Sequence, residues 1–208
     1  MEPASQGCLK RHCLVTVGAT VGFEDLTRAV LRPAFWEHLK SQGFTALRIQ
    51  CGPDITWASS ELSSHSDDIP PGMTVDVFEV SKNLMKEEMA LCKPVHGQRR
   101  LGLVISHAGT GTILDAWKLG LPIIVVPNTR LLNDHQTELA RHLGNEGYAI
   151  HSSTGREAIS KAELLWEDNK SRWPPNDPSR SQDADAISIW DIQPGGAQKE
   201  EVAQMTHD

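Results

Sequence analysis

The sequence predicts an α/β domain built on a parallel sheet, and three observations lead to this fold class. Short apolar runs recur between residue 13 and about residue 150. Segments with helical spacing of apolar residues separate them, and glycine stands in most of the connecting loops. Short apolar runs bounded by turn residues are typical of buried strands, and their alternation with helices indicates parallel pairing.

The first half of the chain contains three expected strands, at residues 14–17, 46–51 and 74–80. A helix is expected over residues 24–42, divided or kinked at Pro33 because proline cannot donate a helical hydrogen bond. The Ser-, Asp- and Pro-rich residues 55–72 predict a loop, and residues 82–91 predict a helix. The polar residues 92–100 predict a surface insertion before the next strand.

The central stretch, residues 103–136, predicts a strand, a glycine-rich loop, a helix and a second strand. The strands are expected at residues 103–105 and 123–126. Thr110 or Thr112 can cap the helix, and Gly120 can end it. The apolar residues expected to point inward from it are Ile113, Leu114 and Trp117. A helix over residues 134–145 and a short strand at residues 148–150 complete the predicted sheet domain.

The glycine-rich loop has the composition of a phosphate site. Gly109 and Gly111 allow close approach of the backbone, and a helix start offers unpaired N–H groups and a positive dipole end. His107 and the hydroxyl groups of Thr110 and Thr112 add possible donors.

Asp115 follows Gly111 by one helical turn, so its carboxylate can face the same ligand and accept hydrogen bonds from a ribose. The alternative is a plain glycine-rich turn. The histidine before the loop, the acid after it and a polar cluster at residues 133–136 favour a ligand site.

Composition and charge limit the other possibilities. The formal net charge of −7 argues against nucleic acid as a partner. No apolar run is as long as a membrane span, and residues 1–11 lack the apolar region of a signal peptide. The four cysteines form no CxxC pair, which favours a reducing compartment, and the nine histidines show no metal-ligand spacing. We divide the chain into a flexible N-terminus (1–12), an α/β domain with the expected ligand site (13–168, with a helix at 155–168) and a polar, mostly disordered tail (169–208).

Four stretches together resemble one family of proteins. They are Thr16-Val17-Gly18-Ala19-Thr20, Ile49-Gln50-Cys51-Gly52, residues 103–111, and Asn133-x-His135-Gln136. The family is the soluble catalytic subunit of the UDP-GlcNAc transferase of dolichol-linked oligosaccharide synthesis. It is similar to the donor-binding, C-terminal half of GT-B glycosyltransferases, a domain like that of glycosyltransferase family 28. The longer loop at residues 92–100 and the polar tail depart from the family pattern.

The resemblance implies a single Rossmann-like domain that carries half of an active site. The implied reaction is inverting transfer of GlcNAc from UDP-GlcNAc to dolichyl-pyrophosphate-GlcNAc, the second step of N-glycan precursor assembly. A membrane-anchored subunit would supply the acceptor half in a heterodimer at the cytosolic face of the endoplasmic reticulum, with a cytosolic pool of the soluble subunit. No cofactor and no metal are implied, and the one Asp-x-Asp triplet, Asp183-Ala184-Asp185, lies in the predicted tail.

The resemblance also implies roles for individual residues. The candidate catalytic residues are His107 and His135, with His107 expected to hydrogen-bond a phosphate. The residues expected to bind the substrate are Gly18, Thr20, Gly109, Thr110, Gly111, Thr112, Asp115, Asn133 and Gln136. The catalytic base is expected from the partner subunit. The alternatives are a solvent-facing position at a helix start for His135 and a cap of the buried stripe for Gln136.

Two other classes of protein compete with this interpretation. A dinucleotide-dependent oxidoreductase would have GxGxxG, but Leu114 stands where the third glycine belongs, and the acid Asp115 lies inside the helix. A non-catalytic subunit that binds a nucleotide sugar, or acts as a scaffold, fits the same motifs. The catalytic base is expected outside this chain whether the subunit is catalytic or not.

Overall fold

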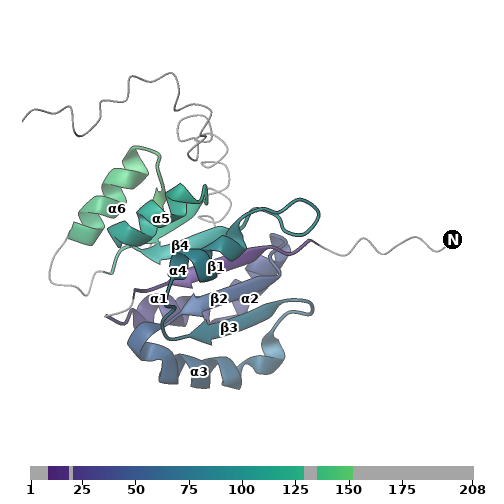
Figure 1. Cartoon of the computed structure of the whole chain (residues 1–208). Helices are drawn as coiled ribbons and strands as arrows, with labels where there is room; N and C mark the ends of the chain where they lie inside the picture. Colours follow the sequence, from purple (N-terminus) through teal and green to yellow (C-terminus); the bar gives the residue numbers. More distant parts are fainter. Residues whose placement is uncertain (1–8, 19–20, 129–134, 152–208) are drawn as a thin grey trace, which may run out of the picture. The chain divides into compact units, whose positions relative to one another are not determined.

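Every strand of the sheet runs in the same direction, as the alternation of strands and helices predicts (Figure 1). The computed structural model describes residues 9–18, 21–128 and 135–151. The strands are β1 (His12–Thr16), β2 (Ala46–Gln50), β3 (Thr74–Phe78), β4 (Leu103–His107), β5 (Ile123–Val126) and β6 (Ile150–His151). Their order is β3-β2-β1-β4-β5-β6, which is that of a doubly wound Rossmann-like sheet.

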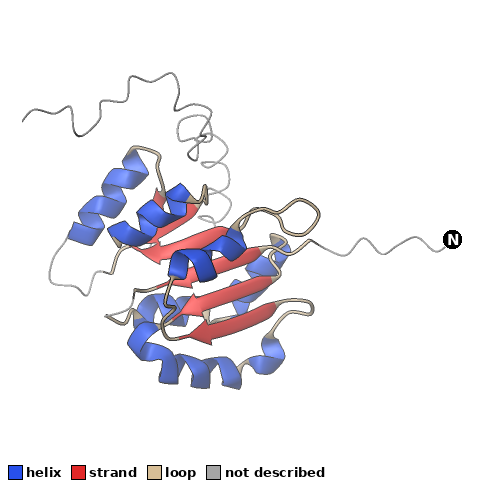
Figure 2. Cartoon of the chain, in the orientation of Figure 1, coloured by secondary structure: helices blue, strands red, loops and turns tan. Residues whose placement is uncertain are grey.

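Helices cover both faces of this sheet (Figure 2). One face packs against α1 (Glu24–Val30), α2 (Pro33–Ser41) and α3 (Ile55–Ser64). The other packs against α4 (Leu84–Glu87), the 3-10 turn η3 (Met89–Cys92), α5 (Thr110–Lys118) and α6 (His135–Asn145). Because both faces are covered, the central strands β1, β4 and β5 are mostly apolar, which is the pattern that the sequence shows.

The side chains of β1 show how the two layers share the sheet. Cys13 and Val15 are fully buried against the α1–α3 layer, whereas Leu14 is buried in the α4–α6 layer. Pro33 divides the first predicted helix as expected, because it is the first residue of α2. The chain turns between the two helices, and the Trp36 indole Nε1 donates to the Val30 carbonyl at 2.8 Å.

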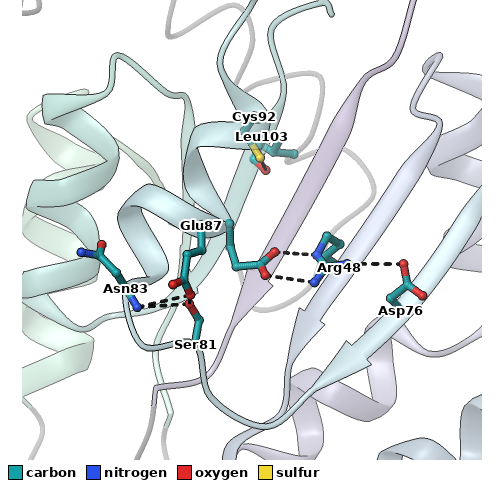
Figure 3. Close-up of polar contacts among 8 residues, drawn as sticks. Arg48, Asp76, Ser81, Asn83, Glu87, Cys92 and Leu103 are labelled. Atoms are coloured by element: carbon teal, nitrogen blue, oxygen red, sulfur yellow. Dashed lines mark hydrogen bonds and ion pairs between the residues drawn. The ribbon is translucent and has the colours of Figure 1, made fainter.

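Polar contacts hold the crossover between β3 and β4 against the sheet (Figure 3). Arg48 on β2 donates from Nε and Nη2 to the two carboxylate oxygens of Glu88, at 2.5 and 2.9 Å, and its Nη1 lies 3.6 Å from Asp76 on β3. Ser81 and the backbone N–H of Asn83, which precede α4, donate to the carboxylate of Glu87, the last residue of that helix. These contacts position the segment that leads into β4.

The predicted loop at residues 55–72 was wrong in its first half. Residues 55–64 form α3, followed by a 3-10 turn at Ser66–Asp68. Ile55, Ala58 and Leu62 recur at helical spacing and pack against the core, with Ala58 fully buried. The serines in this segment made its apolar spacing hard to recognise in the sequence. Burial of the apolar face decided the conformation despite their moderate helix propensity.

Three smaller expectations also need correction. The helix predicted over residues 82–91 is broken into α4 and η3, because the chain leaves helical hydrogen bonding around Glu88. Leu114 is 46% exposed, and Ala116 takes the inward position with Ile113. Neither Thr110 nor Thr112 caps α5, since Gly109 is the N-cap residue. The expected helix at 155–168, the tail, and residues 1–8 lie outside the described residues.

Candidate functional site

The loops after β1 and β4 meet at the carboxyl edge of the sheet, because these two strands are neighbours. Thr16 pairs with Ser106 at the end of the two strands. From β1 the chain continues to helices on one face, and from β4 it continues to α5 on the other. This is the topological switch point, where open α/β sheets bind their ligands.

His107 is held at this point between two glycines. A Cβ atom on Gly18 would lie 3.1 Å from Cε1 and Nε2 of the imidazole, and one on Gly109 would lie 2.4 Å from Nε2. Gly18 also has φ +90°, a conformation that other residues rarely adopt. The positive φ favours glycine at position 18, and a side chain at position 109 would force the histidine ring or the loop to shift.

The protonation of His107 follows from its surroundings. Nδ1 lies 3.4 Å from the Thr16 carbonyl oxygen, which can only accept, so Nδ1 carries the hydrogen in a long hydrogen bond. Burial lowers the pKa of His107, and the contact with Thr16 raises it by less. The ring is therefore neutral near pH 7, and its Nε2 is an acceptor. To donate to a phosphate, as the sequence predicts, Nε2 must gain a proton, which a neighbouring anion favours.

The start of α5 offers backbone donors beside this ring. Gly109 is an extended N-cap residue with no capping side chain, and the first intrahelical bond is made by Ile113 N–H to the Gly109 carbonyl at 3.2 Å. The N–H groups of Thr110, Gly111 and Thr112 precede that bond and have no acceptor within the helix. Gly111 is exposed, and a Cβ atom there would meet nothing within 4 Å. An anion can therefore approach this end of the helix closely.

Asp115 lies one turn into α5, with its side chain 35% exposed. Its Oδ1 lies 3.4 Å from Nζ of Lys118, an exposed lysine on the same helix. A partly exposed pair of this kind contributes little to stability, so the carboxylate can exchange the lysine for a ligand hydroxyl.

A second polar group stands after β5. The backbone N–H of Asn128 donates to Oε1 of Gln136 at 3.2 Å, and Nδ2 of Asn128 donates to the Gly22 carbonyl at 3.4 Å. Asn128 is buried and thus links the loop after β1 to the first turn of α6. Asn128 was not among the site residues predicted from the sequence. Its signal was a polar residue two positions after the end of a buried strand, at the edge where Gly18 and His107 were already expected.

The predicted site residues that the structure describes therefore fall into three sets. The ring of His107 lies beside Gly18 and Gly109, and Gln136 accepts a hydrogen bond from Asn128. Thr110, Gly111, Thr112 and Asp115 lie on α5. Thr20 and Asn133 lie outside the described residues, and of His135 only the position at the start of α6 is described.

The remaining nucleophilic and metal-binding side chains offer no second centre in the described ranges. Burial raises the pKa of Cys51 and of Cys92 to about 12, and it raises that of Cys13 as well, so the three thiols stay protonated. Among residues 9–18, 21–128 and 135–151, no group of three or more His, Cys, Asp or Glu side chains could hold a metal ion.

A doubly wound sheet with an open helix start at its switch point defines a Rossmann-like domain equipped to hold an anion. The chain belongs to the family of the glycosyltransferase family 28 C-terminal domain, which its residues 12–187 match. This confirms the family that the four sequence stretches indicated.

Within this family the chain is similar to subunits named UDP-N-acetylglucosamine transferase subunit ALG13. The human protein is 35% identical over 137 residues, which are 66% of this chain and 10% of the human protein. The Yarrowia lipolytica protein is 35% identical over 139 residues, 67% of this chain and 63% of that protein. The chain thus spans a tenth of the first relative and under two thirds of the second.

Solved structures agree with the fold. An NMR solution structure of ALG13 aligns with a TM-score of 0.53 at 26% identity, covering 83% of this chain and 94% of the other. The glycosyltransferase of kitacinnamycin aligns with a TM-score of 0.50 at 18% identity, covering 86% of this chain and 37% of the other. In the part of the chain that the structure describes, no helix has the length and apolar character needed to cross a bilayer.

Proposed function

We propose that this chain is the donor-binding subunit of a UDP-GlcNAc transferase that adds GlcNAc to dolichyl-pyrophosphate-GlcNAc. The observation that carries the proposal is the open N-terminus of α5 beside a histidine fixed by two glycines. The printed names of the relatives support the donor and the status of a subunit. The partner is a membrane-anchored subunit that binds the acceptor, and the heterodimer works at the cytosolic face of the endoplasmic reticulum.

The donor pyrophosphate lies in this proposal against the backbone N–H groups of Thr110, Gly111 and Thr112. The hydroxyl groups of the two threonines add donors, and we assign Gly18 and Thr20 to the same phosphates. Asp115 releases Lys118 and accepts hydrogen bonds from the ribose.

The sugar of the donor lies toward the start of α6. Asn133, His135 and Gln136 bind its hydroxyl groups in this proposal. Asn128 supports the arrangement, because its backbone N–H donates to Oε1 of Gln136. The amide nitrogen of Gln136 then remains to donate to a sugar hydroxyl group.

Transfer is a direct displacement with inversion at the anomeric carbon. The 4-hydroxyl oxygen of the acceptor GlcNAc forms the new bond, the bond to the UDP oxygen breaks, and UDP leaves with the electron pair. A base on the partner subunit takes the hydroxyl proton. The charge that develops on UDP is stabilised by the preorganised N–H groups of α5 and by the imidazolium form of His107. The proposal needs no metal, because these donors replace one.

Reconstitution tests the proposal. The purified chain should bind UDP-GlcNAc and show negligible transfer, and addition of the membrane subunit with a lipid-linked GlcNAc acceptor should restore turnover. Full activity of the single chain would contradict the divided active site. Donor binding without any turnover by the reconstituted pair would identify the chain as a non-catalytic nucleotide-sugar-binding or scaffold subunit instead.

A further inference from the structure

A cavity of about 550 Å³ lies at the amino end of the sheet, opposite to the edge that carries the site described above. Its wall is the insertion that departs from the family pattern. Lys10 N–H donates to the Gln98 carbonyl at 3.1 Å, and Arg100 N–H donates to the Lys10 carbonyl at 2.8 Å. The insertion is thus paired with the residues that lead into β1, and the cavity lies between them.

The charge of this cavity is opposite to that of the chain. Lys10, His12 and Arg99 line it, and none of its lining residues is acidic, although the chain has a net charge of −7. Glu88 is the nearby acid, and both of its oxygens accept from Arg48. Its hydrogen bonds therefore go to Arg48 and not to the basic groups of the cavity.

Two buried nitrogens in the cavity residues have no hydrogen-bond partner among the described atoms. They are Nδ1 of His12 and Nε of Arg99. Burial lowers the pKa of His12, and the charges of Arg99, Lys10 and Arg48 lower it further, whereas Glu88 raises it. A buried polar nitrogen without a partner is unfavourable, and an anion with several oxygen atoms would satisfy both nitrogens if the two side chains turned toward the cavity.

We propose that this cavity binds the phosphate group of a small soluble molecule, separately from the donor site. A phosphate can accept from the Arg99 guanidinium, the Lys10 ammonium and the His12 ring together. The volume exceeds that of a phosphate ion, and Leu9 and Leu91 offer an apolar wall to the remainder of the molecule. A phosphorylated lipid headgroup shares this chemistry. The test therefore distinguishes the phosphate of a small soluble molecule from that of a lipid headgroup.

NMR titration of the full chain with inorganic phosphate at constant ionic strength tests the proposal. We expect saturable shifts at the amides of Lys10, His12 and Gln98, with an increase in the pKa of His12. Arg99→Gln should weaken this binding about ten-fold or more, as loss of a charge-assisted hydrogen bond implies. Arg100→Gln is the matched control, because it removes the same charge one residue along, where the guanidinium points toward Gly43 and not into the cavity.

Three outcomes would overturn the proposal: no saturable shift at these amides, equal loss in both variants, or unchanged binding in a folded Arg99→Gln protein. The amide spectrum of each variant reports whether it is folded. If the Arg99→Gln protein is not folded, Lys10→Gln replaces it as the test variant. Vesicles of phosphatidylcholine with and without phosphatidic acid form the second arm. Binding to the acidic vesicles alone, without a response to inorganic phosphate, would assign the cavity to a lipid headgroup and overturn the soluble ligand.

Discussion

Gly111→Ala separates a phosphate site from an ordinary helix start. Gly111 is the second residue of α5, it has no positive φ, and a Cβ atom there would meet nothing within 4 Å. Alanine is therefore accommodated without strain and should stabilise the helix by roughly 0.5–1 kcal/mol. For a domain of this size, that gain corresponds to an increase in Tm of roughly 1–4 °C.

The same methyl group would stand where a phosphate must approach the N–H groups of α5. Loss of one charge-assisted hydrogen bond costs roughly 1.5–3 kcal/mol, which weakens UDP binding by about 10- to 150-fold. Thermal unfolding and isothermal titration with UDP on the same protein measure both effects. Unchanged UDP affinity in a Gly111→Ala protein of equal or greater stability would refute our placement of the pyrophosphate.

Gly109→Ala is the contrasting variant in the same loop. Its backbone angles, φ −84° and ψ 120°, suit alanine, but the new Cβ atom would lie 2.4 Å from Nε2 of His107. The ring or the loop must move, so we expect a lower Tm together with weaker UDP binding. A Gly109→Ala protein with the wild-type Tm would show that His107 is not confined as described.

Three further predictions concern charged groups. Asp115→Ala should lower kcat/KM for UDP-GlcNAc in the assembled enzyme by about 10- to 150-fold without changing Tm, and an unchanged kcat/KM would remove this residue from the site. Because burial lowers the pKa of free His107 and an adjacent phosphate favours the imidazolium, UDP should raise that pKa and bind more tightly as the pH falls, which ¹H–¹⁵N NMR of the ring can follow. Arg11, whose pKa burial lowers to about 10, donates to the carbonyls of Leu101 and Gln42 at 2.9 and 2.7 Å. Arg11→Ala leaves both without this donor and should cost about 2–6 kcal/mol in the free energy of unfolding by denaturant.

Local features of the sequence determined the elements and the chemistry of the central loop. The strand β5 begins and ends where the apolar run does, and Pro33 divides the first helical segment where its missing N–H predicts. Such features depend on neighbouring residues in the chain, so they can be read without tertiary contacts. The resemblance to a known family then added an activity and a partner that no local pattern contains.

Tertiary structure alone decided how distant segments meet. His107 contacts Thr16 and Gly18, about ninety residues earlier, because β1 and β4 pair at the centre of the sheet. Asn128 became part of the site only when its strand placed it beside Gly22 and Gln136.

The same reason explains the errors of the sequence analysis. The serine-rich residues 55–64 are helical because Ala58 is buried against the core. Leu114 faces outward because α5 rests on the sheet through Ile113 and Ala116. The free energy that fixes each of these comes from surface buried between segments far apart in the chain, and a local pattern does not carry that information.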